Sequence, residues 1–208
     1  MSGYGDVIAS FLGGKLKTLS GDVYNEFSLQ FELACHLREM FNDRRLLGMP
    51  AGNGEAGDSR MKVLFERNVR DMWPERNGEG FTKKEIDLSI MKGDVPECAI
   101  ELKYPRNGQY PEEMFAFCED IRFLEELREA GFREAYAVCL VDDPAFCNRD
   151  GRQRRTDGIY APFRDGKPIH GIIEKPTGDR SRMVDVEGEY HVDWHETDDG
   201  RWYYVIAI

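Results

Sequence analysis

The fold is decided by the stretch Lys84-Glu85-Ile86-Asp87-Leu88-Ser89-Ile90-Met91-Lys92-Gly93-Asp94-Val95-Pro96-Glu97-Cys98-Ala99-Ile100-Glu101-Leu102-Lys103-Tyr104. Two runs rich in β-branched and apolar residues flank a Gly-Asp turn, which is typical of a β-hairpin. If the turn centres on Asp94, Asp87 lies opposite Glu101, and Glu85 lies opposite Lys103. We therefore predict that this hairpin brings two carboxylates together.

Side chains alternate between the two faces of a strand. One face of the hairpin then carries the apolar residues Ile86, Leu88, Ile90, Ile100, Leu102 and Tyr104, and the other carries Glu85, Asp87, Ser89, Ala99, Glu101 and Lys103. Directly opposite residues have Cβ atoms about 4.5–5.5 Å apart, and like charges at that distance destabilise a sheet. A divalent cation between the carboxylates would reverse the sign of that interaction, so the pattern indicates a metal site.

The spacing of these residues resembles a nuclease signature. Asp87, thirteen intervening residues and Glu101-Leu102-Lys103 are similar to the motif of the PD-(D/E)xK, or restriction-endonuclease-like, superfamily, with Ile86 in the position of the Pro. The resemblance implies that Asp87, Glu101 and the carbonyl of Leu102 bind Mg²⁺ (or Mn²⁺), and that Lys103 activates the attacking water. It also implies a further acidic residue from the preceding helix, for which Glu26 is the candidate.

The order of expected elements agrees with this family. A helix is expected from an N-cap at Asp22 to about residue 42, with Phe27, Phe31, Ala34, Leu37 and Phe41 on its core face. A strand over 61–65 and the hairpin follow, and then a helix between Pro111 and Gly131. The unbroken apolar run 135–141 is typical of a parallel strand. Helix, strand, hairpin, helix and parallel strand form the restriction-endonuclease-like α/β core, expected here over residues 22–143.

The remaining segments are expected to complete a single domain of residues 1–208. Residues 6–12 predict a short helix that ends at Gly13-Gly14, and residues 42–59 predict a turn-rich mobile loop. Residues 144–208 predict a β-rich extension with strands over 183–186, 189–195 and 201–208. This extension is expected to lengthen the core sheet or to pack beside it.

The charge balance limits how the chain binds nucleic acid. A net charge of −11 over 208 residues argues against a broad basic surface. Positive charge is concentrated locally, and Arg152, Arg154 and Arg155 are the candidates for phosphate contacts, together with Gln109 and Tyr110 after the hairpin. The expected partner is nucleic acid, with DNA as the expected substrate, and a homodimer or a protein partner would supply the missing basic surface.

Cysteine usage and hydropathy bear on localisation. Five cysteines without a Cys-x-x-Cys pair, of which Cys35, Cys118 and Cys139 lie in apolar patterns, predict reduced core residues of a cytoplasmic protein. No run of about 18 apolar residues is present, so no membrane span is expected.

Three alternatives stay open at this stage. The hairpin is also compatible with a solvated edge on which Lys103 pairs with Glu85, while Glu26 pairs with Gln30 on a solvated helix flank. The fold is also compatible with a catalytically inactive binding module acting in a larger complex. Finally, His191, Asp193 and His195 alternate with Tyr190, Val192 and Trp194, which predicts either a zinc site or an exposed strand face.

Overall fold

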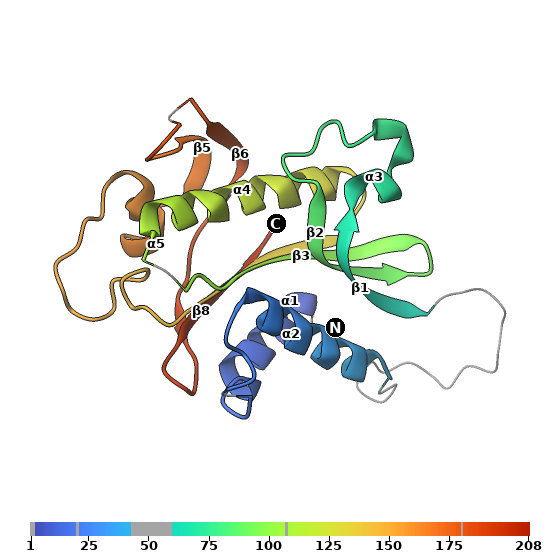
Figure 1. Cartoon of the computed structure of the whole chain (residues 1–208), viewed down its shortest axis with the longest axis horizontal. Coiled ribbons are helices and arrows are strands. Elements are labelled where there is room, and N and C mark those ends of the chain that lie inside the picture. The colour runs from blue at the N-terminus through green and yellow to red at the C-terminus, as the bar shows by residue number, and fades with distance from the viewer. Residues whose placement is uncertain (1–2, 20, 43–59, 107, 180) are drawn as a thin grey trace.

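The protein, seen here in a computed structural model that describes residues 3–19, 21–42, 60–106, 108–179 and 181–208, is a mixed α/β protein with a mainly antiparallel central sheet (Figure 1). The sheet has the strand order β1-β2-β3-β4-β8-β7. Strands β3 and β4 run parallel, as the apolar run 135–141 predicted, and the other pairings are antiparallel. The strands are β1 (Met61–Asn68), β2 (Glu85–Lys92), β3 (Val95–Lys103), β4 (Glu134–Val141), β7 (His195–Glu196) and β8 (Trp202–Ala207).

Helices cover both faces of the sheet (Figure 1). Helix α4 (Tyr110–Glu129) lies on one face, and α1 (Tyr4–Ser10) and α2 (Glu26–Asn42) lie on the other. A separate two-stranded sheet, β5 (Ile169–Glu174) and β6 (Met183–Tyr190), packs on α4, so this helix is covered from two sides. The short elements are α3 (Val69–Met72), α5 (Ala161–Arg164) and 3-10 turns at Pro74–Arg76 and Gly158–Tyr160.

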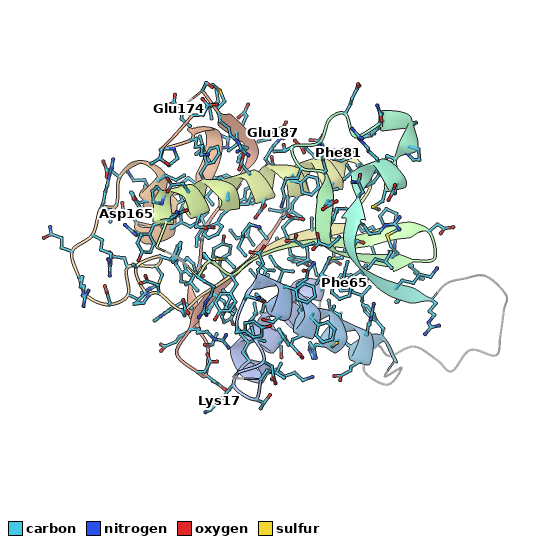
Figure 2. All side chains as sticks on the ribbon, in the orientation of Figure 1. Lys17, Phe65, Phe81, Asp165, Glu174 and Glu187 are labelled. Carbon is cyan, nitrogen blue, oxygen red and sulfur yellow. The ribbon has the colours of Figure 1, made fainter. Side chains whose placement is uncertain are left out.

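Side chains on the two faces of the central strands belong to two apolar cores, which fill the space between the helices and the sheet (Figure 2). Ala99 of β3 and Cys139 of β4 belong to the core under α4, whereas Ile100 and Val138 belong to the core under α1 and α2. Burial of this apolar area is the main favourable contribution to folding. It also fixes β3 and β4 rigidly between two helical layers.

The hairpin register agrees with the prediction at the strands but not at the turn. Leu88 pairs with Ile100 and Ile90 with Cys98, as expected. The turn itself is a two-residue loop, with Lys92 paired to Val95 and Gly93 at a φ of 63°. A bulge between Ile90 and Met91 adds the one residue that restores the predicted register further along.

Helix α2 differs from its prediction at the start and on its core face. It begins at Glu26 rather than at Asp22, because Asn25 and Ser28 form a reciprocal cap: Ser28 N donates to Asn25 Oδ1 at 2.8 Å, and Asn25 N donates to Ser28 Oγ at 3.0 Å. Phe27 and Phe31 are 66% and 48% exposed, so their assignment to the core was wrong. The aliphatic stripe Leu29, Leu33, Ala34 and Leu37 is buried instead and turns both rings outward.

Two other expectations need correction. The first helix does not end at Gly13-Gly14 but continues as a π-helical turn, Phe11–Lys15, in which a Cβ on Gly13 would lie 3.2 Å from the hydroxyl of Tyr203. Residues 191–194 are not a strand, and β5 was not predicted. The loop expected over 42–59 lies, from residue 43 onward, outside the described residues.

The C-terminal part both lengthens the main sheet and packs beside it, because β8 pairs with β4 while β5 and β6 cover α4. All five cysteines are free thiols, and Cys35 is only partly buried. Within the described ranges, no helix combines the length and the apolar character needed to cross a membrane.

Candidate functional site

Asp87 and Glu101 lie where the β2–β3 ladder stops. Leu88 and Ile100 form the last pair of that ladder. Beyond it, the Asp87 carboxylate accepts a hydrogen bond from the backbone N–H of Leu102 at 2.8 Å, and the Glu101 carboxylate accepts one from the backbone N–H of Asp87 at 3.1 Å. The two carboxylates therefore take the place of carbonyl groups that a regular ladder would supply.

The irregularity extends to the other neighbours of Asp87. Strand β1 pairs with Leu88 and Ile86 on either side of it, and Glu66, between the paired residues of β1, has a φ of 46°. The carbonyl of Asp87 accepts a hydrogen bond from Gln30 Nε2 of α2 at 2.5 Å, and the same nitrogen donates to Glu66 Oε1 at 3.0 Å. Ile86 packs in the core under α4 although Leu88 packs in the opposite core. Alternation along β2 thus breaks at Asp87.

Lys103 and Glu26, both predicted from the sequence, meet at the end of β3. Lys103 Nζ donates to the carbonyl of Leu102 at 3.2 Å and lies 3.6 Å from Glu26 Oε1. The other carboxylate oxygen of Glu26 accepts from the backbone N–H of Tyr104 at 3.1 Å. The proposed pairing of Lys103 with Glu85 is therefore not formed, and Glu26, although its side chain is 44% exposed, contacts Lys103 and Tyr104.

Two charged residues of the site were missed by the sequence reasoning. Lys83, in the segment before β2, donates hydrogen bonds to Glu101 Oε2 and, at 2.8 Å, to Asp120 Oδ1. Asp120 of α4 also pairs through Oδ2 with Lys103 Nζ at 3.3 Å. Asp120 comes three residues after Phe117 and four before Leu124, on the apolar stripe of α4, and an acid in such a stripe is a signal that sequence alone contains.

Burial sets the electrostatics of the carboxylates. Glu101 is 1% exposed, and this burial, followed by the Asp87 carboxylate, raises its pKa well above the ordinary value. Burial also raises the pKa of Asp87 to about 6, against the opposing effect of the Lys103 and Lys83 ammonium groups. The hypothesis of a solvated edge is therefore wrong, because β2 and β3 are interior strands and their acidic pair is largely withdrawn from water.

The two lysines remain cationic in this environment. Burial lowers the pKa of Lys83, but the carboxylates of Asp120 and Glu101 outweigh it and the net shift is upward. The same balance, with Asp120 and Glu26 as the facing acids, raises the pKa of Lys103. Three carboxylates, Asp87, Glu101 and Asp120, face these two ammonium groups, and Glu26 adds a fourth acid beside Lys103.

The residues expected to contact substrate are not joined to this cluster by any ion pair or hydrogen bond within the part of the chain that the structure describes. The hydroxyl of Tyr110 donates to Asp143, and its ring packs edge-on against Phe146. Gln109 is the exposed N-cap residue of α4. Two of the three arginines are held by neighbouring acids, Arg154 by Asp150 at 2.5 Å and Arg155 by Asp157 at 2.5 Å. Arg152 is the most exposed of the three, at 79% of its side chain, and lies 3.7 Å from Asp150.

The alternative zinc site at residues 191–195 has the geometry of an exposed strand-like face. Val192 and Trp194 are buried, and His191, Asp193 and His195 are exposed. His191 lies 3.5 Å from Glu189, and the ring of His195 tilts over Tyr203. Alternation of polar and apolar residues in this segment therefore reflects packing of one face on the core.

The oxygens at the hairpin fit the chemistry of Mg²⁺, which prefers carboxylate, carbonyl and water oxygens. Asp87, Glu101 and the carbonyl of Leu102 would hold the ion. As they stand, no three His, Cys, Asp or Glu side chains among the described residues are spaced to hold a metal ion. The Nζ atoms of Lys83 and Lys103 account for the distances between the carboxylates, because they lie between the acidic side chains and contact their oxygens.

Comparison with known proteins gave no match to a family model, to a curated protein or to a solved structure.

Proposed function

We propose that this protein is a Mg²⁺-dependent nuclease with a restriction-endonuclease-like core, hydrolysing phosphodiester bonds in nucleic acid, with DNA as the expected substrate. The observation that carries the proposal is the interlocked Asp87–Glu101 pair beside the Leu102 carbonyl and Lys103. Buried acids with strongly raised pKa values, next to cations at a break in regular structure, are typical of functional sites.

The order of elements supports the same assignment. Helix α2, strand β1, hairpin β2–β3, helix α4 and strand β4, parallel to β3, follow one another as the family core requires. Helix α2 contributes Glu26, which the resemblance implies as the additional acid. Fold alone would not establish an activity, so the proposal depends on the residues of the site.

Each residue has a distinct role in the proposed reaction. Asp87, Glu101 and the Leu102 carbonyl would hold the metal ion. When bound, Mg²⁺ offsets the charge that develops on the transferring phosphate and acidifies a water molecule. Lys103 orients the attacking water and stabilises negative charge in the transition state. Glu26 fixes the Lys103 ammonium and, through the Tyr104 N–H, the end of β3.

The test combines metal binding with plasmid nicking. Mg²⁺ and Mn²⁺ are titrated calorimetrically into wild type and into the variant Asp87→Asn/Glu101→Gln, and nicking of supercoiled DNA is followed in parallel. The matched control is Glu85→Gln/Asp94→Asn, which removes the same charge from exposed positions of the same hairpin. We expect binding and nicking in wild type and in the control, and neither in the site variant.

A second candidate is an inactive nuclease-fold module that binds a partner in a larger complex. The observation that favours it is charge: the chain carries −11, and Arg154 and Arg155 are already paired with acids. Metal binding without nicking of DNA or RNA would favour this module. Absence of metal binding in wild type would reject the nuclease.

A further inference from the structure

Lys83 reaches the acidic cluster from outside the strands. It belongs to the segment between the 3-10 turn at Pro74–Arg76 and strand β2, and its side chain is 29% exposed. Its two partners are far more deeply placed, with side-chain exposures of 0% for Glu101 and 5% for Asp120. A flexible cationic side chain thus enters a buried acidic site from the surface, with a path back to solvent.

The other lysine of the site is anchored differently. Lys103 extends from β3 itself, is 18% exposed and contacts the Leu102 carbonyl, Asp120 and Glu26. It lacks a contact of its own with the Glu101 carboxylate within the described structure, whereas Lys83 donates directly to it. Lys83 is therefore the cation that competes with a metal ion for Glu101.

The position of Lys83 gives this competition a direction. A metal ion held by Asp87, Glu101 and the Leu102 carbonyl needs the carboxylate to which Lys83 Nζ already donates. Two cations in contact with one carboxylate repel each other. Lys83, on a flexible and partly exposed side chain, is the cation that is able to leave.

We propose that Lys83 is an internal cation that holds Glu101 and Asp120 in the metal-free protein and withdraws to solvent when a divalent cation binds. This inference rests on the proposed metal site. Lys83 then acts as a positioning residue, because it keeps the Glu101 carboxylate in place for the metal ion. It also lowers the apparent affinity for the metal ion, because binding must break the Lys83–Glu101 contact. Asp120 then loses its contact with Lys83 but keeps its ion pair with Lys103.

Amine footprinting tests the withdrawal in the wild-type chain. Reductive methylation of lysines is quantified by peptide mass spectrometry with and without saturating Mg²⁺ or Mn²⁺. We expect modification of Lys83 to rise severalfold with either ion, while the exposed neighbour Lys84 changes little and Lys103 stays protected. Metal binding, confirmed by calorimetry, without any change at Lys83 would overturn the inference and leave the nuclease proposal intact.

Metal affinity of variants gives an independent readout. Lys83→Met removes the cation and keeps a similar stem, so Mn²⁺ should bind about tenfold more tightly or better, since a contact ion pair near a protein surface is worth several RT. Lys84→Met, with the same change in net charge, should bind like wild type, and Lys83→Arg should bind no more tightly than wild type. Equal affinities of Lys83→Met and Lys84→Met would contradict the exchange.

The variants also separate this inference from the proposed function. If Lys83→Met does not fold, the footprint of wild type alone decides. Binding to Lys83→Met but not to wild type would overturn the exchange, because Lys83 would then block the metal site instead of leaving it. If wild type and Lys83→Met both fail to bind Mg²⁺ and Mn²⁺, the exchange and the metal-dependent nuclease are both rejected.

Discussion

Asp87 and Glu101 hold one another through the backbone, because each carboxylate accepts a hydrogen bond from an N–H group of the opposite strand. The Glu101 carboxylate binds Asp87 N at 3.1 Å, and the Asp87 carboxylate binds Leu102 N at 2.8 Å. The same acids thus terminate the ladder and form the candidate site. Substitution of either by alanine would leave a backbone N–H unsatisfied, so isosteric amides are the informative variants.

The stability of the protein should depend on the ionisation of Asp87. An aspartate in the unfolded chain titrates near about 3.9, whereas burial raises the pKa of Asp87 to about 6 in the folded chain. Between these values the folded state binds more protons, so the contribution of Asp87 to stability is present below about pH 4 and is lost as the pH rises through about 6. The Tm of wild type minus that of Asp87→Asn should fall over this window. A difference that is constant between pH 4 and 7 would contradict the shift.

Metal affinity should follow the opposite trend with pH. Carboxylates must be deprotonated to bind a metal ion, and burial raises the pKa of Asp87 to about 6. The apparent affinity for Mg²⁺ should therefore weaken as the pH is lowered from 7 to 5. Calorimetry in buffers of different ionisation enthalpy should also detect proton release on binding at pH 6. Affinity that does not change across this range would exclude Asp87 as a ligand.

Lys103 should affect catalysis more than metal binding. Lys103→Met leaves both carboxylates in place but removes the ammonium beside the Leu102 carbonyl. We expect nicking to fall by roughly 10²-fold or more, with Mn²⁺ affinity changed only a few-fold. Lys92→Met, at an exposed position of β2, is the control. Nicking within threefold of wild type would remove Lys103 from the mechanism.

Asp120 should be important for stability as well as for the site. Asp120→Asn takes one partner from each lysine, and breaking such a buried network costs roughly 2–4 kcal/mol when the partial exposure of Lys83 is allowed for. Urea denaturation should measure this loss, with Glu129→Gln, exposed on the same helix, as a near-neutral control. Lys83→Met should cost less in Asp120→Asn than in wild type, because the Lys83–Asp120 contact is already lost. Strict additivity would argue against a shared network.

Arg152 should contribute more to DNA binding than its neighbours. It is 79% exposed, whereas Arg154 is 24% exposed and 2.5 Å from Asp150. Arg152→Ala should reduce the slope of log affinity against log salt by about 1, and Arg154→Ala should reduce it less. Lys17→Ala, at an exposed position, serves as the control (Figure 2). A larger effect from Arg154 would contradict this order.

Local sequence patterns predicted the hairpin and the proximity of Asp87 to Glu101, because alternation and turn chemistry act over few residues. The prediction assumed a turn centred at Asp94. The two-residue turn in the structure would by itself shift the pairing of β2 with β3 by one residue. The bulge between Ile90 and Met91 compensates for it. No local pattern reveals such a bulge, since it relieves a conflict between turn geometry and the packing of both strand faces.

Long-range contacts were the part that could not be predicted. Lys83 meets Asp120 across 37 residues, and only the path of α4 over the sheet brings them together. The exposure of Phe27 and Phe31 was missed because aromatic residues at helical spacing usually mark a core, and here an aliphatic stripe occupies it. The sequence of α2 contains two apolar faces of similar strength, and tertiary packing determines which of them is buried.

The position of β8 between β4 and β7 has a consequence for the order of events during synthesis. Strand β4 stands beside the site-bearing strand β3, but its other edge stays unpaired until residues about 70 positions later, near Ala207, have been made. Pairing across so long a separation is slow to form. On the ribosome, the partial sheet that contains the acidic pair therefore waits with the edge of β4 open, and chaperone binding is most useful at that stage.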